Sequence, residues 1–133
     1  MAFNLNKLAL QEIATLQLVS PESKQPLFAD DEETLPLTIA VYGKTSKVYR
    51  KWQAEASRKV AARKGKILSD TAEIEDTADW LATITSSISN FDIDGVPLNS
   101  FESYKSLYSN LAFSWVGEQV VEFLRSGDSF LTK

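Results

Sequence analysis

Cysteine and histidine are both absent from the 133-residue sequence. Without cysteine, the chain has no disulfide, no thiolate nucleophile and no thiolate metal ligand. Without histidine, it lacks the commonest general base and the commonest transition-metal ligand, so neither a Ser-His-Asp nor a Cys-His catalytic arrangement is possible within it. An enzyme of this composition would depend on carboxylates, lysine and tyrosine alone. We therefore predict no enzymatic activity, no catalytic residue, no metal and no cofactor.

Long apolar segments are missing as well. Lys7 and Glu12 interrupt the apolar residues near the N-terminus, which leaves no continuous core of signal-peptide length. The longest uncharged runs, Trp80–Phe91 and Ser106–Gly117, contain twelve residues each, whereas a membrane-spanning helix needs about 18 or more. We expect a soluble, intracellular protein that does not bind a membrane.

The composition is otherwise that of an ordinary globular protein. Apolar residues make up 44% of the chain and charged residues 24%, which suits one domain over residues 1–133 with a buried core. Fourteen basic and eighteen acidic residues give a net charge of −4 and a pI near 4.8. Because nucleic-acid-binding domains are usually basic, we expect no nucleic-acid partner.

Two segments in the first third predict β-strands. Ile13–Val19 and Leu35–Tyr42 are rich in leucine, β-branched residues and tyrosine. The loop between them contains Pro21, Pro26 and an acidic cluster. Two such runs joined by a proline-rich loop indicate an antiparallel pair. The β-rich part of the chain is therefore expected at about residues 13–43.

From Thr45 onward the apolar spacing becomes that of helices. Thr45 or Ser46 is expected to cap a helix that runs to about Lys64, and Gly65 to end it. A second helix is expected after an N-cap at Asp70, with an apolar stripe formed by Ile74, Ala78, Leu81, Thr85 and Ile88. Since the connection is short, the two helices should form an antiparallel hairpin.

The last third predicts a tight turn and two short helices. Asp94-Gly95 is a strong signal for a hairpin turn. Ser100–Tyr108 predicts one helix, and Ser114 is expected to cap another that ends at Gly127. The expected fold is α+β: a small antiparallel β element packed with a helical hairpin and short C-terminal helices. The helical part spans about residues 45–127.

Two partial motifs are too incomplete to predict a site. Gly43-Lys44-Thr45 lies between a predicted strand and a predicted helix, as a phosphate-binding loop does, but Thr38 stands where the motif needs its first glycine. Residues 90–95 resemble the first half of a calcium loop, yet its twelfth position, a bidentate carboxylate, falls on Phe101. A strand-to-helix turn and a hairpin turn account for these two segments.

The strongest charge feature is a basic segment. Residues 44–66 hold nine of the fourteen basic residues and one acidic residue, Glu55. The favoured interpretation is a solvated helix face beside the acidic helix that follows. The alternatives are a docking surface for an acidic partner and a nucleic-acid site with stacking aromatic residues. Trp52 shares a stripe with apolar residues and is expected in the core; Trp80 and Trp115 are expected either in the core or as interface anchors.

Three features, taken in order, carry a family resemblance. The first is the predicted strand that ends in Val41-Tyr42-Gly43 and leads into the basic helix. The second is the turn NFDIDGVPLN, placed after an acidic helix that contains Trp80-Leu81. The third is the ending SWVGEQVVEFLRSGDSFL, residues 114–131. Over about residues 37–131 the sequence resembles the tail assembly chaperones of lambda-like bacteriophages (siphoviruses), whose long tails are non-contractile.

The resemblance implies a small viral protein of the host cytoplasm that is absent from the mature virion. It implies binding to the long helical tape measure protein, which is kept soluble while tail tube subunits polymerise around it. A longer form of the chain, made by programmed ribosomal frameshifting near Lys133, and the tail tube subunits are further implied partners. Because many copies are needed to coat a long filament, we also expect a homo-oligomer. The family has no catalytic motif to transfer.

Two groups of residues are the candidates for partner binding. The first group lies on the basic helix and consists of Lys47, Arg50, Lys51 and Arg58. The second group, Trp115 and Phe123, lies on the last predicted helix. The alternative function is a structural tail or head–tail connector subunit that stays in the virion. A carboxylate enzyme that uses a pair such as Asp92 and Asp94 has only proximity in sequence behind it.

Overall fold

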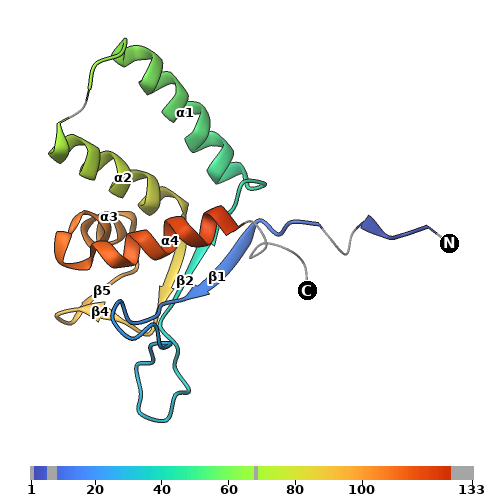
Figure 1. Cartoon of the computed structure of the whole chain (residues 1–133), viewed down its shortest axis with the longest axis vertical. Coiled ribbons are helices and arrows are strands. Elements are labelled where there is room, and N and C mark those ends of the chain that lie inside the picture. Colours follow the sequence, from blue (N-terminus) through green and yellow to red (C-terminus); the bar gives the residue numbers. More distant parts are fainter. Residues whose placement is uncertain (1, 6–8, 68, 127–133) are drawn as a thin grey trace.

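The structure, a computed structural model, describes residues 2–5, 9–67 and 69–126 (Figure 1). Its fold is α+β, as the sequence predicts, with a small antiparallel sheet and mainly helical structure after it. In chain order the elements are β1 (Ile13–Gln17), β2 (Thr38–Tyr42), α1 (Lys47–Arg63), α2 (Asp70–Ile84), β3 (Thr85–Ser89), β4 (Asp92–Ile93), β5 (Val96–Pro97), α3 (Phe101–Ser109), a 3₁₀ turn (Leu111–Phe113) and α4 (Ser114–Ser126).

The main sheet has the strand order β1-β2-β3, and both neighbouring pairs are antiparallel. The predicted pairing of the first two strands is confirmed, with Ile13 opposite Tyr42 at one end of the ladder. Successive side chains of a strand point to opposite faces. One face of the sheet is therefore buried, through Ala14, Leu16, Ile39 and Val41.

A hydrophobic core joins this buried face to α2, α3 and α4. Its fully buried side chains include Leu18, Ile39, Leu81, Ile84 and Val120. Figure 1 shows α4 crossing the sheet, with α2 and α3 beside it. At opposite ends of the molecule, α1 and the long β1–β2 loop project from this body (Figure 1). Among the described residues, none of the helices combines the length and the apolar character that a membrane span requires.

The predicted second helix is too long at its C-terminal end. α2 ends at Ile84, and Thr85–Ser89 continues without a loop as β3, which pairs with β2. The stretch from Thr83 to Ser89 consists of β-branched residues and serines, which are weak helix formers. Pairing with the free edge of β2 therefore outweighs the helical spacing of Thr85 and Ile88. The part predicted to be helical thus contains a strand of the main sheet.

Serine side chains cap three of the helices. Ser46, Ser69 and Ser100 each accept a hydrogen bond from the backbone N–H three residues further along the chain. Of the two predicted caps of the first helix, Thr45 and Ser46, the structure has Ser46. The prediction of Asp70 is wrong by one residue because the hydroxyl of Ser69 fills the cap. Asp70 is the first helical residue instead, where its negative charge suits the positive end of the helix dipole.

The predicted turns fall where the sequence places them. Asp94 and Gly95 have φ values of 52° and 80°, both in the left-handed region that a two-residue hairpin turn requires, and they join β4 to β5. At the end of α1, Lys64 and Gly65 also have positive φ, so the predicted stop at Gly65 is confirmed. Gly127, the predicted end of the last helix, lies outside the described residues.

Candidate functional site

The basic helix α1 starts from a turn fixed by its own polar groups. The Ser46 hydroxyl donates to the Gly43 carbonyl at 2.7 Å and accepts from the Tyr49 N–H at 3.1 Å. The Gly43 N–H donates to the Glu12 carbonyl at 2.8 Å. The Gly43-Lys44-Thr45 segment is thus the strand-to-helix turn that its sequence favours. This turn directs α1 away from the end of the sheet (Figure 1).

Two contacts hold α1 against α2. The indole of Trp52 stacks on that of Trp80 with ring centroids 5.0 Å apart and planes inclined by 23°. Near the other end of the hairpin, Arg63 Nη2 forms an ion pair with Asp76 Oδ2 at 3.0 Å. These contacts confirm the predicted antiparallel hairpin. The prediction of Trp52 as a core residue is wrong: no side chain of α1 is buried, and Trp80, not Trp52, packs against the core.

The four basic candidate residues lie together on the outer side of α1. Lys47, Arg50, Lys51 and Arg58 are all exposed, and their spacing places them on one helical face opposite Trp52. We call these four residues the basic face. Among the described residues, no carboxylate lies within 4.0 Å of any of them. Their exposure is what both a solvated face and a docking surface require, and among the described residues α1 forms an ion pair with the acidic helix only through Arg63 and Asp76.

The other two candidate residues lie on α4. Trp115 and Phe123 are half-buried and pack against the edge of the core. Between them, at helical spacing, Gln119 accepts from the Val19 N–H at 3.0 Å and donates to the Val19 carbonyl at 2.8 Å. This bidentate contact fixes α4 to the chain after β1. The structure thus places the six candidate residues on two different elements, with Trp115 and Phe123 forming a partly exposed ridge.

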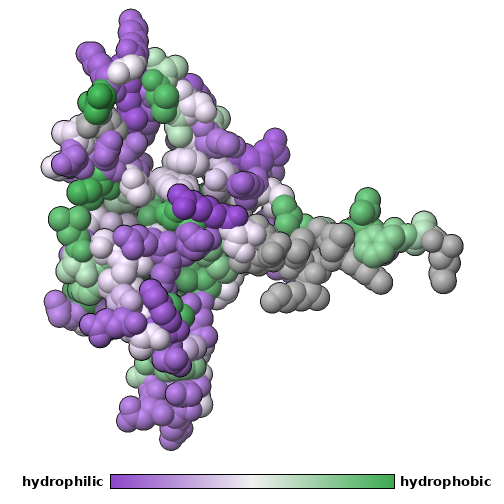
Figure 2. Space-filling view, in the orientation of Figure 1, coloured by the Kyte–Doolittle hydropathy of each residue, from purple (hydrophilic) through white to green (hydrophobic). Residues whose placement is uncertain are grey.

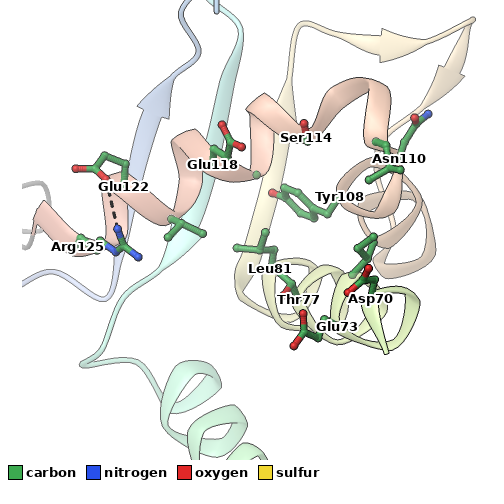
Figure 3. A pocket seen from close by; sticks show the side chains of 14 residues that line it. Asp70, Glu73, Thr77, Leu81, Tyr108, Asn110, Ser114, Glu118, Glu122 and Arg125 are labelled. Carbon is green, nitrogen blue, oxygen red and sulfur yellow. Dashed lines mark ion pairs between the residues drawn. The ribbon is translucent and has the colours of Figure 1, made fainter. Parts of the chain in front are cut away.

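A groove that the sequence does not predict lies between α2 and α4. Its volume is about 800 Å³. Figure 3 shows the side chains of Leu81 and Tyr108 in the space between the two helices. The buried side chains of Leu81 and Tyr108 form its apolar floor. Ile74, Val121 and the exposed Leu111 are further apolar lining residues. Gly117 brings α4 close to α2, since a Cβ atom there would lie 3.2 Å from Leu81 Cδ1.

The groove carries negative charge. Its charged lining residues are Asp70, Glu73, Glu118, Glu122 and Arg125. Arg125 Nη1 lies 3.9 Å from Glu122 Oε2 (Figure 3); among the described residues, the other three carboxylates have no cationic partner within 4.0 Å. An apolar floor between acidic walls is suited to a segment that is both basic and able to pack closely.

The floor of the groove includes a buried polar pair. The Tyr108 hydroxyl lies 2.7 Å from the Thr85 hydroxyl, which donates to the Leu81 carbonyl at 2.7 Å. Burial raises the pKa of Tyr108 to about 12, so the phenol is neutral at physiological pH.

In the part of the chain that the structure describes, no three Asp or Glu side chains form a cluster able to hold a metal ion.

Sequence spacing contains a partial signal for this groove. Asp70, Glu73, Ile74, Thr77 and Leu81 share one face of α2, and the lining residues of α4 share another at the same intervals. Which two helices face each other is decided by the packing of the core and is not visible in the spacing.

Comparison with known proteins finds no family model, no curated protein and no solved structure that matches the chain.

Proposed function

We propose that this protein is a tail assembly chaperone of a bacteriophage with a long non-contractile tail. It binds the tape measure protein in the host cytoplasm, keeps it soluble during assembly of the tail tube, and is absent from the mature virion. The ordered sequence features of residues 37–131 support the family. The observation that carries a binding role is the position of α1, a helix outside the core with an exposed basic face.

Two properties of α1 suit it to binding a partner: it adds little to the hydrophobic core, and it exposes cationic side chains. Isolated helices of fewer than about 12–15 residues are marginal in water, and longer ones still depend on tertiary packing. α1 has 17 residues and none of them is buried, so it adds little to the core. Its outer side carries four exposed cationic side chains. Such a helix is suited to contacting an acidic segment of a partner, here the tape measure protein.

The ridge on α4 provides a second candidate contact of a different chemistry. Trp115 and Phe123 are half-buried, so the core fixes part of each side chain while the remainder stays accessible. Large aromatic side chains of this kind are enriched among the residues that dominate binding energy at interfaces. A helical partner would use its apolar residues here and its acidic residues on the basic face.

The first test is co-expression with the longest helical open reading frame encoded beside this one. We expect the two proteins to elute together in size-exclusion chromatography with light scattering, and the long protein to be insoluble without this chain. Mass spectrometry of purified virions should not detect this chain. Its presence there in many copies would instead support the alternative, a structural tail or head–tail connector subunit.

The surface is tested by matched charge reversals. Lys51→Glu with Arg58→Glu changes the basic face, and Lys24→Glu with Lys66→Glu makes the same charge change at exposed positions outside it. We expect only the first pair of substitutions to weaken co-elution with the tape measure protein. Equal co-elution of both variants would remove the basic face from the proposal and leave the ridge as the contact.

A further inference from the structure

The basic face and the groove have matching lengths. On α2 the groove is lined from Asp70 to Leu81, and on α4 from Ser114 to Arg125. Each wall spans eleven residue steps, which is about 16 Å at 1.5 Å per residue. The basic face, from Lys47 to Arg58, spans the same number of steps and therefore the same length. Three turns of α1 thus match the full length of both walls.

The charges of the two surfaces are opposite and largely uncompensated within one molecule. α1 contains six basic residues and one acidic residue, and the described structure gives only Arg63 an ion pair. The groove has four carboxylates and one guanidinium, with Glu122 and Arg125 as its internal pair. Opposite potentials of this kind favour association and fix its register.

The outer side of α1 also has the shape that a groove requires. Ala54 and Ala61 are exposed and lie on the same helical side as Lys51 and Arg58. Small residues allow one helix to approach another closely, while the long basic side chains on either side reach outward. The alanines would face the apolar floor, and the lysine and arginine side chains would face the acidic walls.

We infer that the basic face of α1 in one copy of this protein docks in the acidic groove between α2 and α4 of a second copy. One molecule cannot make this contact with itself, because Trp52 holds the opposite side of α1 against α2 and directs the basic face away from it. Each copy therefore offers one face and one groove. Contacts of this head-to-tail type build rings when the rotation closes and open helical arrays when it does not.

The inference adds to the proposed function but does not require it, because it concerns the chain alone. In an array, every basic face except that of the terminal copy is covered by a neighbouring groove. The ridge formed by Trp115 and Phe123 lies on a different side of α4 from the groove residues Glu118 and Val121. An assembled array then offers the tape measure protein the ridge of every copy, together with the basic face of the terminal copy.

Two charge-reversal variants test the contact by sedimentation velocity over a concentration series at low salt. The face variant carries Lys51→Glu and Arg58→Glu, and the groove variant carries Glu118→Lys and Glu122→Lys. We expect the mass of the wild-type chain to increase with concentration. Each variant alone should be monomeric, with a dissociation constant raised more than about 100-fold, because two of the four charges on one surface are reversed and then face like charges.

Mixing the two variants provides the decisive arm. The reversed face of one variant is complementary to the reversed groove of the other, and the two unaltered surfaces are complementary as well. We therefore expect an equimolar mixture to assemble again, which also shows that both variants are folded. The variant with Lys24→Glu and Lys66→Glu should assemble like the wild type.

Several outcomes would overturn the inference. A wild-type chain that stays monomeric throughout the series would do so, as would an assembly that persists in both variants or a mixture that fails to recover. Because the face variant enters both tests, the wild-type chain is what separates these outcomes from the test of function. A monomeric chain that still co-elutes with the tape measure protein would leave the proposed function standing, whereas a self-assembling chain that never binds that protein would leave only this inference.

Discussion

At the scale of single residues, the Tyr108–Thr85 pair makes a measurable contribution to stability. Tyr108→Phe removes the hydrogen bond to Thr85 and keeps the ring, while Thr85 retains its bond to the Leu81 carbonyl. We expect the free energy of unfolding at neutral pH, measured with urea, to fall by about 1 kcal/mol. Tyr104→Phe is the matched control, since among the described residues the Tyr104 hydroxyl has no hydrogen-bond partner; it should change stability by less than half as much.

The same phenol makes stability depend on alkaline pH. Burial raises the pKa of Tyr108 from 10.0 to about 12 in the folded protein. Below pH 10 both states hold the proton; between pH 10 and 12 the unfolded chain releases it first, so stability falls as pH rises. A shift of this size corresponds to about 3 kcal/mol. The wild type should therefore lose stability over this interval relative to Tyr108→Phe. A constant difference between their urea midpoints would contradict this expectation.

Asp30 organises the loop between β1 and β2 in a way that titration can detect. Its carboxylate accepts hydrogen bonds from the Thr34 hydroxyl and from the Thr34 and Leu35 N–H groups. The side-chain hydrogen bond from Thr34 is the largest cause that lowers the pKa of Asp30 below its ordinary value of 3.8. We expect carboxyl NMR to show this lowered pKa, and Thr34→Ala to bring it back toward 3.8. The control Thr15→Ala, on β1 away from the loop, should leave it unchanged.

At the scale of elements, the stack of Trp52 on Trp80 contributes to holding α1 against α2. Trp52→Ala removes the stack on Trp80. The lost aromatic contact and the lost burial of apolar area together should cost about 1–2 kcal/mol of the free energy that holds α1 in place. Because α1 contributes no buried residue, we expect local opening of α1 rather than global unfolding. Hydrogen exchange of α1 amides should accelerate about tenfold while that of β2 amides does not change. Gln53→Ala, at the exposed neighbouring position, should leave both rates unaltered.

The elements also show where prediction from the sequence succeeds and where it ends. Local chemistry suffices for a cap at Thr45 or Ser46 and for the Asp94-Gly95 turn, because each depends on a few neighbouring residues. The pairing of β1 with β2 is predicted from the composition of the two strands and the loop between them. Local chemistry does not suffice for β3, whose residues continue a helical stripe and become a strand only because β2 offers a free edge.

The sequence likewise predicts some features of the candidate site and misses others. The exposure of Lys47, Arg50, Lys51 and Arg58 follows from charge alone and is predicted. The place of Trp52 outside the core is missed, because apolar spacing does not reveal that α1 extends beyond the sheet (Figure 1). The groove is missed as well, since it is formed by two helices that lie thirty residues or more apart in the sequence and meet only after the core has packed.

At the scale of the whole molecule, charge is segregated. Figure 2 shows mainly hydrophilic colours over both projecting ends and hydrophobic patches on the body between them. Six cations lie on α1, and three carboxylates that have no ion pair among the described residues line the groove. Because salt screens such surfaces, we expect the dissociation constant of self-association to rise at least about tenfold between about 0.1 M and 1 M NaCl. Sedimentation equilibrium measures this constant. An association that strengthens with salt would instead indicate an apolar interface.

The direct continuation of α2 into β3 has a consequence for the rate of docking. One wall of the groove is rigidly joined to the sheet at Thr85, and the other is fixed to Val19 through Gln119. Because both walls are tied to the rest of the fold, we expect docking without a slow conformational step. With electrostatic steering, its association rate constant should reach on the order of 10⁷ M⁻¹ s⁻¹ or more at low salt. Subunits would then add quickly, which allows an array to lengthen rapidly during assembly.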